Sequence, residues 1–400
     1  MKSDRWLLPE GIDELLPREA QVLETLRRRL LDLYDTWGYD MVIPPFVEYV
    51  ESLLTGVGSD LDVQTFKLID QRNGRLMGVR ADMTPQVARI DAHRLRHDAP
   101  TRLCYIGTVL RTQSDEFASS RSLVQIGAEL YGHDGNASDV EMLSLMLETL
   151  ALAGLQNVYI DIGHVGIFQG LAGQAGFTQE QKNDLFDALQ RKSVPEINEC
   201  LTLLPMENNV RQMLMELAWL NGDISVLQEA REKFKGAPDD VQQAIDDMAQ
   251  VAEQIQRRYP NISLHCDLAE VRGIQYHTGI VFAAYISGVG QSIAQGGRYN
   301  NIGRFFGRAR PATGFSADLR SLIKLGTLSS RRKSGIFAPA EDDPALQQTL
   351  QQTLQKKITA LRQAGERVIP QLANQTGGAK DLDCDRQIVL RDGQWIVETI

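Results

Sequence analysis

The sequence predicts an α+β protein in which helices flank a mostly antiparallel sheet, with a helical insertion and a small C-terminal α/β unit. Strand patterns come in groups, apart from helix patterns, which favours this class over a doubly wound parallel sheet. Residues 165–258 have an almost wholly helical pattern, and the basic stretch 329–335 has the composition of a linker. We therefore expect a core over residues 1–328, interrupted by the insertion, and a second unit over residues 329–400.

Composition and charge limit the class of protein. The chain has 400 residues, of which 43% are hydrophobic and 24% charged, so it can bury the cores of two or three globular domains. No apolar run is long enough for a secretion signal or a membrane span, and we expect a cytoplasmic protein without a membrane partner. The net charge of -10 weighs mildly against a tRNA partner.

The cysteines give no sign of a metal site or of disulfides. They stand far apart, without a C-x-x-C pair or a partnering pair of histidines, at Cys104, Cys200, Cys266 and Cys384. We expect a reducing compartment, no metal and no cofactor.

The N-terminal part begins with a helix at 17–37 and a short strand at 41–43. The helix has an apolar stripe formed by Val22, Leu26, Leu30, Leu33, Tyr34 and Trp37. Further on, Thr84 is expected to cap a helix that takes Pro85 into its first turn. This places Asp82 and Thr84 together in the turn that enters the helix.

Two strands with clear alternation follow, at 105–111 and 123–131. In the second, one face is apolar and the other carries Gln125 and Glu129 on either side of Gly127. Such a strand lines a pocket or faces water.

The remaining elements are predicted from periodicity and turn signals. Ser138–Glu141 has the pattern of a capping box and opens a helix to about residue 153. Outside the insertion, the core should add strands at 158–162, 262–267, 274–286 and 292–295 and a helix at 316–325. The C-terminal unit should contain a strand at 336–338, a helix at 344–364, a strand at 367–369 and a hairpin turning at Asp392–Gly393.

Together, these segments resemble class II aminoacyl-tRNA synthetases, most closely the catalytic domain of histidyl-tRNA synthetase, over residues 5–325. The motifs occur in order and with matching spacings, at Leu8–Pro17, Gly38–Pro44, Val79–Thr84, Tyr105–Arg111, Val124–Glu129, Val271–Phe282 and Gln295–Asn300. Chance would rarely supply this combination.

The resemblance implies a histidine-binding site. Its residues would be Asp82, Thr84, Arg111, Gln125, Glu129, Arg272, Tyr276 and His277. By the family's pattern, Asp82 and Thr84 take the α-ammonium and Arg272 the carboxylate. Gln125 lies at the amino-acid end, and Arg111 remains for an α-phosphate. Glu129, Tyr276 and His277 meet the imidazole, although Gln275 and His277 replace an Asp and a Tyr of the synthetases.

Departures from the synthetases concentrate where ATP would sit. The Glu and Arg expected after motif 2 are Gln113 and Ser114, and the loop that follows carries two acids with Arg121 as its only cation. In motif 3, Ser321 stands in place of the arginine, with Arg320 one position earlier. An arginine that binds phosphate contributes about 10³–10⁵ in rate in phosphoryl transfer, so we expect no useful adenylation.

Taken singly, the site residues have simpler interpretations. Gln125 and Glu129 would face solvent on a strand, and His277 would be a core histidine with satisfied nitrogens. His164 and His265 are interpreted as structural.

A non-catalytic family fits the combination of a retained amino-acid site and a lost nucleotide site. The chain resembles the regulatory subunits of ATP phosphoribosyltransferase, the first enzyme of histidine biosynthesis, which lack the usual anticodon-binding domain. This resemblance implies a short-form catalytic phosphoribosyltransferase as partner in a hetero-octamer, histidine as effector, and no tRNA. A homodimer through residues 38–47 would be the building block.

Two other functions stay open. One is an active histidyl-tRNA synthetase, opposed by Ser114, Ser321 and the acidic loop. The other is a different stand-alone enzyme that uses the class II fold on a small substrate.

Overall fold

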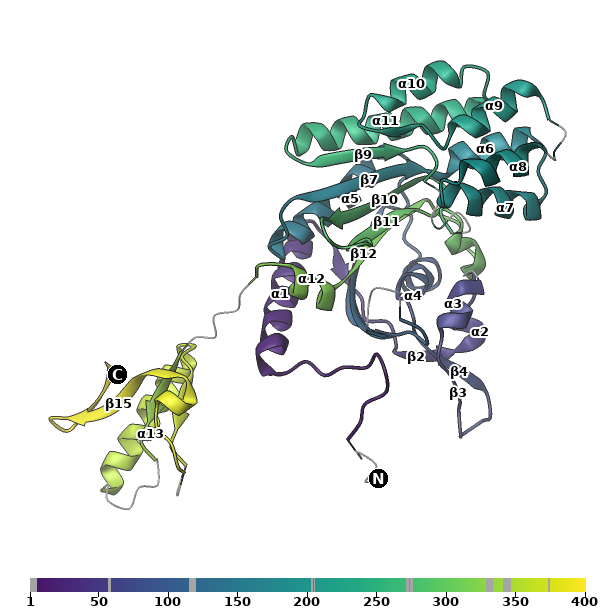
Figure 1. Cartoon of the computed structure of the whole chain (residues 1–400). Coiled ribbons are helices and arrows are strands. Elements are labelled where there is room, and N and C mark those ends of the chain that lie inside the picture. The colour runs from purple at the N-terminus through teal and green to yellow at the C-terminus, as the bar shows by residue number, and fades with distance from the viewer. Residues whose placement is uncertain are drawn as a thin grey trace, which may run out of the picture. The chain divides into compact units, whose positions relative to one another are not determined.

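The structure is a computed structural model that describes residues 6–56, 59–114, 120–202, 204, 206–270, 273, 276–328, 334–340, 347–372 and 375–400. The chain divides into two compact units, Met1–Leu328 and Ser329–Ile400 (Figure 1). Within the described ranges, no helix combines the length and the apolar composition that crossing a membrane requires.

The larger unit is built on a nine-stranded sheet in the part of the chain that is described. In sheet order, the strands are β1 (Asp40–Met41), β5 (Thr101–Leu110), β6 (Ser122–Tyr131), β12 (Ala312–Asp318), β11 (Ala294–Arg298), β10 (Ile280–Ile286), β7 (Val158–His164), β9 (Ser263–Asp267) and β8 (Asn221–Gly222). Neighbouring strands are antiparallel except at β1–β5 and β7–β9. The predicted α+β fold with a mostly antiparallel sheet is confirmed.

Helices cover both faces of the central strands. The main core lies between the sheet and the helices α1 (Pro17–Thr36), α5 (Asn136–Leu152) and α12 (Leu319–Leu325). A smaller core lies on the opposite face under α4 (Thr84–Arg89), which continues as a π-helical turn at Ile90–Leu95. Ile126 and Ala128 of β6 are fully buried in the main core, so the predicted apolar face of this strand is confirmed.

The first helix follows its sequence pattern closely. Leu26, Leu30 and Tyr34 are fully buried, which confirms the apolar stripe. The helix ends at Thr36, and Gly38 adopts a left-handed φ of 77°, a conformation that favours glycine after a helix.

The insertion packs six helices beside β7 and β9 (Figure 1). They are α6 (Val165–Gln174), α7 (Gln179–Gln190), α8 (Val194–Thr202), α9 (Asn208–Glu216), α10 (Val226–Lys233) and α11 (Asp239–Arg258). The helical pattern of this stretch is confirmed, with only the short β8 between helices. One side of α11 is deeply buried, including Ile245, Met248 and Ile255.

A small three-stranded sheet and a few short helices complete the larger unit. The sheet has the order β2 (Val47–Tyr49), β4 (Leu76–Val79) and β3 (Lys67–Ile69), and the helices are α2 (Val50–Leu53), α3 (Ser59–Gln64) and a 3-10 turn at Ile302–Phe306.

In its described residues, the C-terminal unit contains a four-stranded sheet and one long helix. Its elements are β13 (Gly335–Ala338), α13 (Gln348–Gln363), β14 (Val368–Pro370), a 3-10 turn at Lys380–Leu382, β15 (Cys384–Arg391) and β16 (Gln394–Thr399). Ile336, Leu354 and Trp395 lie in its core. The predicted hairpin turn is confirmed, because Asp392 and Gly393 have φ values of 49° and 77°, as a type I′ turn requires.

Several predicted helix and strand starts are wrong. The capping box at Ser138 does not form, because α5 begins two residues earlier and the Ser138 hydroxyl contacts Arg298 instead. Thr84 is the first residue of α4 rather than its cap. Residues 316–318 extend β12, because they pair with β6 up to Asp318 opposite Gln125.

The strands predicted at 41–43, 274–286 and 292–295 are observed at 40–41, 280–286 and 294–298. The predicted linker lies almost wholly outside the described residues.

Candidate functional site

A cavity of about 380 Å³ opens over the face of the sheet opposite α1 and α5. Its floor comes from β6, β12, β11, β10 and β7, and its sides come from the turn before α4 and the segment before β10. Five predicted site residues line it together, namely Asp82, Thr84, Glu129, Tyr276 and His277. These five residues come from three separate parts of the sequence and converge on one space.

Glu129 lies at the bottom of this cavity and is 1% exposed. Tyr105 donates to its Oε1 at 3.0 Å, and Tyr299 donates to Oε2. Burial raises the pKa of Glu129 to about 8, although the hydrogen bonds from Tyr299, Thr84 and Tyr105 act in the opposite direction. The carboxyl group therefore holds a proton over much of the neutral range.

Gly314 allows this arrangement, because it pairs with Glu129 across β12 and β6. A side chain on Gly314 would collide with the Glu129 carboxylate. The floor needs glycine here because the two backbones and the carboxylate meet at one point.

Asp82 and Thr84 are fixed by hydrogen bonds at the entrance to α4. Gln125 donates to Asp82 Oδ1 at 2.7 Å and accepts from the Met83 amide at 2.9 Å. The hydroxyls of Thr84 and Tyr105 lie 3.0 Å apart. The turn is therefore held in place before any ligand arrives, with the Asp82 carboxylate on the cavity wall.

Three rings, those of Tyr276, His277 and Tyr299, form part of the cavity wall. The ring centroids of Tyr276 and Tyr299 lie 5.0 Å apart, and His277 meets Tyr276 edge to face at 5.3 Å. The Tyr276 hydroxyl is buried and has no hydrogen-bond partner among the described residues. Leaving such a group unpaired costs about 1–3 kcal/mol, which a ligand atom in the cavity would recover.

His277 is neutral, because burial lowers its pKa to about 4. Its Nδ1 lies 3.3 Å from the carbonyl oxygen of Arg298, which can only accept. The proton is therefore on Nδ1, and Nε2 is left as an acceptor. The ring can accept a hydrogen bond from a ligand N–H.

The other predicted site residues are placed differently. Gln125 does not line the cavity but holds Asp82, and Arg111 lies outside the lining, with its Nε 3.4 Å from the carbonyl oxygen of Ala81. Arg272 and Gln275 lie outside the described residues.

The side where a nucleotide would lie has its described cations paired with main-chain oxygens. Arg121 donates to the carbonyl oxygens of Arg111 and Glu10, both at 3.1 Å, and its amide donates to Gly11. Arg320 donates to the carbonyl oxygens of Ser122 at 2.9 Å and Asp13 at 3.4 Å. These contacts fasten the N-terminal segment to the side of the core that the resemblance assigns to a nucleotide.

Ser321 has a local structural role. Its hydroxyl donates to Asp318 Oδ2 at 2.7 Å, and Asp318 also accepts from the amides of Arg320 and Ser321 as the cap of α12. The acids of the predicted loop lie outside the described residues.

Some functional residues escape sequence reasoning. Tyr105 and Tyr299 contact Glu129, and Asp161, Glu270, Gln295 and Ser316 also line the cavity. The alternation of Tyr105 with Gly107 along its strand is a signal for the first, and Tyr299 stands in a motif already noted. Asp161, Gln295 and Ser316 depend on strand register and Glu270 on the turn after β9, which no local pattern reveals.

The two histidines interpreted as structural have clear partners. His164 accepts from the Gly166 amide at 3.1 Å at the start of α6, and burial lowers its pKa to about 4. His265 Nδ1 lies 2.8 Å from Asp161 Oδ1, and this hydrogen bond raises the pKa of His265. Through Asp161, His265 touches the edge of the cavity. No group of His, Cys, Asp and Glu suited to a metal ion occurs among the described residues.

Family models match almost the whole chain. The model described as "Histidyl-tRNA synthetase" matches residues 11–322, and that of the "ATP phosphoribosyltransferase subunit HisZ C-terminal domain" matches residues 333–398. The chain is 57% identical to the ATP phosphoribosyltransferase regulatory subunit of Thioalkalivibrio sulfidiphilus, over 99% of this chain and 98% of that protein.

Solved structures show the same fold. A structure described as an ATP phosphoribosyltransferase regulatory subunit/histidyl-tRNA synthetase from Bacillus halodurans aligns with a TM-score of 0.80 and 27% identity, over 93% of this chain and 94% of that one. Histidyl-tRNA synthetase from Nostoc aligns with a TM-score of 0.78 and 20% identity, over 98% and 97%. The expected class II synthetase-like fold is thereby confirmed.

Proposed function

Because this chain belongs to the family of ATP phosphoribosyltransferase regulatory subunits, we propose that it is a non-catalytic subunit required for the activity of a short-form catalytic phosphoribosyltransferase. In this role it also conveys feedback inhibition by histidine. The regulatory role in histidine biosynthesis follows from the family, whereas the dependence of the partner and the inhibition are our proposals.

One contrast carries the proposal. The amino-acid end of the pocket combines an anion, hydroxyls and an imidazole acceptor around open space, whereas Arg121 and Arg320 are already bound to main-chain oxygens. This favours a chain that binds histidine without activating it.

The chemistry of the pocket suits a free amino acid with an imidazole. Asp82 would take the α-ammonium, Arg272 the carboxylate, and Glu129 with His277 the ring. Charge-assisted contacts of about 1.5–3 kcal/mol each, less the ordering cost, put the affinity in the micromolar range.

The proposed assembly is a cytoplasmic hetero-octamer that contains homodimers of this chain and binds no tRNA. The stretch 38–47 supports self-association, because it carries three exposed large apolar side chains, those of Met41, Ile43 and Phe46. Analytical ultracentrifugation of the chain, alone and with its partner, tests the stoichiometry.

Reconstitution tests the central claim. The catalytic subunit should be inactive alone, become active when this chain is added, and lose activity as histidine is titrated. A catalytic subunit that is fully active without this chain would contradict the proposal. Glu129→Ala should keep the activation and weaken histidine binding, measured by calorimetry, while Glu253→Ala at an exposed position of α11 serves as the control.

The alternative is an active histidyl-tRNA synthetase. An ATP–pyrophosphate exchange assay with histidine separates the two functions, because only a synthetase forms the adenylate. Measurable exchange would contradict the non-catalytic function.

A further inference from the structure

Arg298 connects the ligand pocket with the opposite side of the sheet. Its main-chain oxygen accepts from the Thr278 amide at 2.8 Å and lies 3.3 Å from Nδ1 of His277 in the pocket wall. The neighbouring Gly297 pairs with Gly314 in the floor of the pocket. Because side chains alternate along a strand, the side chain of Arg298 points the other way, towards the start of α5.

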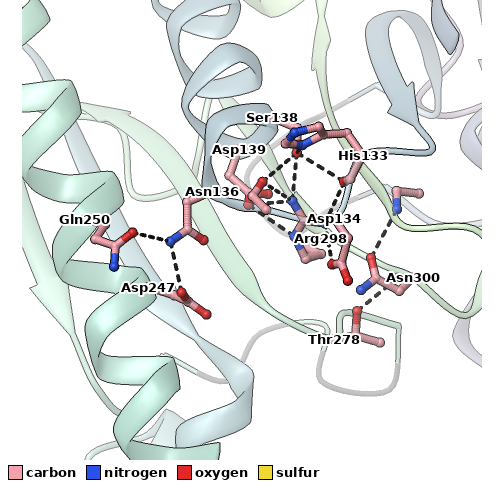
Figure 2. Close-up of polar contacts among 12 residues, drawn as sticks. His133, Asp134, Asn136, Ser138, Asp139, Asp247, Gln250, Thr278, Arg298 and Asn300 are labelled. Atoms are coloured by element: carbon pink, nitrogen blue, oxygen red, sulfur yellow. Dashed lines mark hydrogen bonds and ion pairs between the residues drawn. The ribbon is translucent and has the colours of Figure 1, made fainter. Parts of the chain in front are cut away.

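The side chain of Arg298 is anchored there by five hydrogen bonds (Figure 2). It binds Asp139 Oδ2 through Nε at 3.1 Å and Nη2 at 2.7 Å, and Ser138 Oγ at 2.8 Å. It also donates to the carbonyl oxygens of Gly135 at 2.9 Å and His133 at 3.3 Å. Arg298 is 7% exposed and Asp139 is fully buried, so this contact forms one rigid unit with the turn before α5.

The same turn reaches the insertion. Asn136, the first residue of α5, donates to Asp247 Oδ1 at 2.9 Å and to Gln250 Oε1 at 3.0 Å, both on α11 (Figure 2). An unbroken series of contacts thus leads from His277 through Arg298 and the turn to α11. We name the contact of Asn136 with Asp247 and Gln250 the α5–α11 joint.

The α5–α11 joint is not packed tightly. A cavity of about 520 Å³ opens beside it, lined among others by Asn136, His164, Asp247, Gln254 and Arg298. The two helices share the main core, but at Asn136 hydrogen bonds beside this open space join them. The space leaves the Asn136 side chain room for a second arrangement. In a tightly packed contact the two helices would move together as one body, and Asn136 could not change its arrangement alone.

We infer that Arg298 positions His277 for the ligand and that the α5–α11 joint passes the occupancy of the pocket to the insertion. This inference rests on the proposed function, because it concerns how histidine acts on the partner enzyme. A ligand that contacts His277 favours one position of the Arg298 main chain, and the anchored turn transmits this preference to Asn136. Coupling of this kind needs contiguous contacts and an element with two arrangements.

The test separates binding from response. We expect Asn136→Ala, in the full chain reconstituted with the catalytic subunit, to bind histidine with an affinity within about twofold of the wild type. The histidine concentration that halves the activity should rise at least about fivefold. Glu253→Ala, at an exposed position of α11, is the control and should change neither quantity.

Two results would overturn the inference. One is an unchanged half-inhibiting concentration in Asn136→Ala, and the other is an affinity that falls as much as the response, since that would indicate a merely structural role. Gln250→Ala removes one of the two acceptors on α11 and leaves α5 unchanged, so it decides the matter if Asn136→Ala does not fold. If the wild-type chain itself fails to bind histidine, the proposed function fails, whereas wild-type binding with a wild-type response in both variants refutes the relay alone.

Discussion

The two ends of the ligand pocket treat their polar groups in opposite ways. At the amino-acid end, Asp82, Glu129 and Tyr276 face open space, and the Tyr276 hydroxyl has no partner among the described residues. At the nucleotide side, Arg121 and Arg320 are bound to carbonyl oxygens of the N-terminal segment. Arg121 and Arg320 are thus no evidence that this side binds a phosphate, because both already donate to main-chain oxygens and neither lines the cavity.

The largest effect should come from the buried carboxyl group of Glu129. Its folded-state pKa of about 8 lies above the ordinary value of 4.5, so between these values the folded chain keeps a proton that the unfolded chain has lost. The stabilising contribution of the Glu129 proton is therefore complete below about pH 4.5 and falls as pH rises through this window, by up to about 1.4 kcal/mol per pH unit. Glu129→Gln should remove this dependence.

Urea unfolding at about pH 5 and about pH 7.5 measures this pH dependence of stability. The free energy of unfolding of the wild type should fall by roughly 3 kcal/mol more than that of Glu129→Gln between the two pH values. Glu253→Gln, at an exposed position, should behave as the wild type. Equal losses of unfolding free energy in all three proteins would show that Glu129 is ionised in the folded chain. The amino-acid end would then differ less from the nucleotide side.

The next effect concerns the anion at the entrance to α4. Asp82→Asn keeps the size of the side chain but removes the charge that faces an α-ammonium. We expect histidine affinity to fall about 10–150-fold, the equivalent of a charge-assisted contact of about 1.5–3 kcal/mol. Calorimetry measures the loss, with Asp32→Asn on the exposed side of α1 as control. Unchanged affinity would show that the α-ammonium is bound elsewhere in the pocket.

A smaller effect is expected at the nucleotide side. Arg121→Ala removes two hydrogen bonds to main-chain oxygens, one of them to the N-terminal segment. The free energy of unfolding should fall by about 1–2 kcal/mol, and residues 6–16 should be cleaved faster in limited proteolysis.

Histidine affinity should stay within about twofold, because Arg121 does not line the cavity. Arg18→Ala, at an exposed position of α1, is the control. A loss of histidine binding in Arg121→Ala would show that the two ends of the pocket are coupled, although Arg121 does not line the cavity.

Local signals and long-range contacts explain what the sequence could predict. The first helix and the Asp392–Gly393 turn depend on neighbouring residues, and both are confirmed. The capping box at Ser138 fails because Arg298, 160 residues away, takes its hydroxyl. Thr84 likewise does not cap its helix, and its hydroxyl forms a hydrogen bond with the Tyr105 hydroxyl.

The candidate site also combines features that the sequence could predict with features that depend on long-range contacts. Five residues implied by family resemblance meet in one cavity, yet the lining residues Asp161, Gln295 and Ser316 follow from strand register and could not be read from local patterns. Gln125 shows the limit of a carried-over role, because it lines no part of the cavity and instead holds Asp82 by a hydrogen bond. A motif predicts which residues gather, whereas the hydrogen-bond geometry decides which of them face the ligand.

The smallest effect is expected at Ser321. Ser321→Ala removes one hydrogen bond to Asp318, which still caps α12 through two amides, so the free energy of unfolding should fall by only about 0.5–1 kcal/mol. Ser321→Arg is the sharper variant, because it returns a cation to the position that the resemblance assigns to ATP. We expect no ATP–pyrophosphate exchange from it, since Arg121 and Arg320 remain bound to the N-terminal segment. Exchange in Ser321→Arg would mean that one missing arginine, rather than the pairing of the whole nucleotide side, separates this chain from a synthetase.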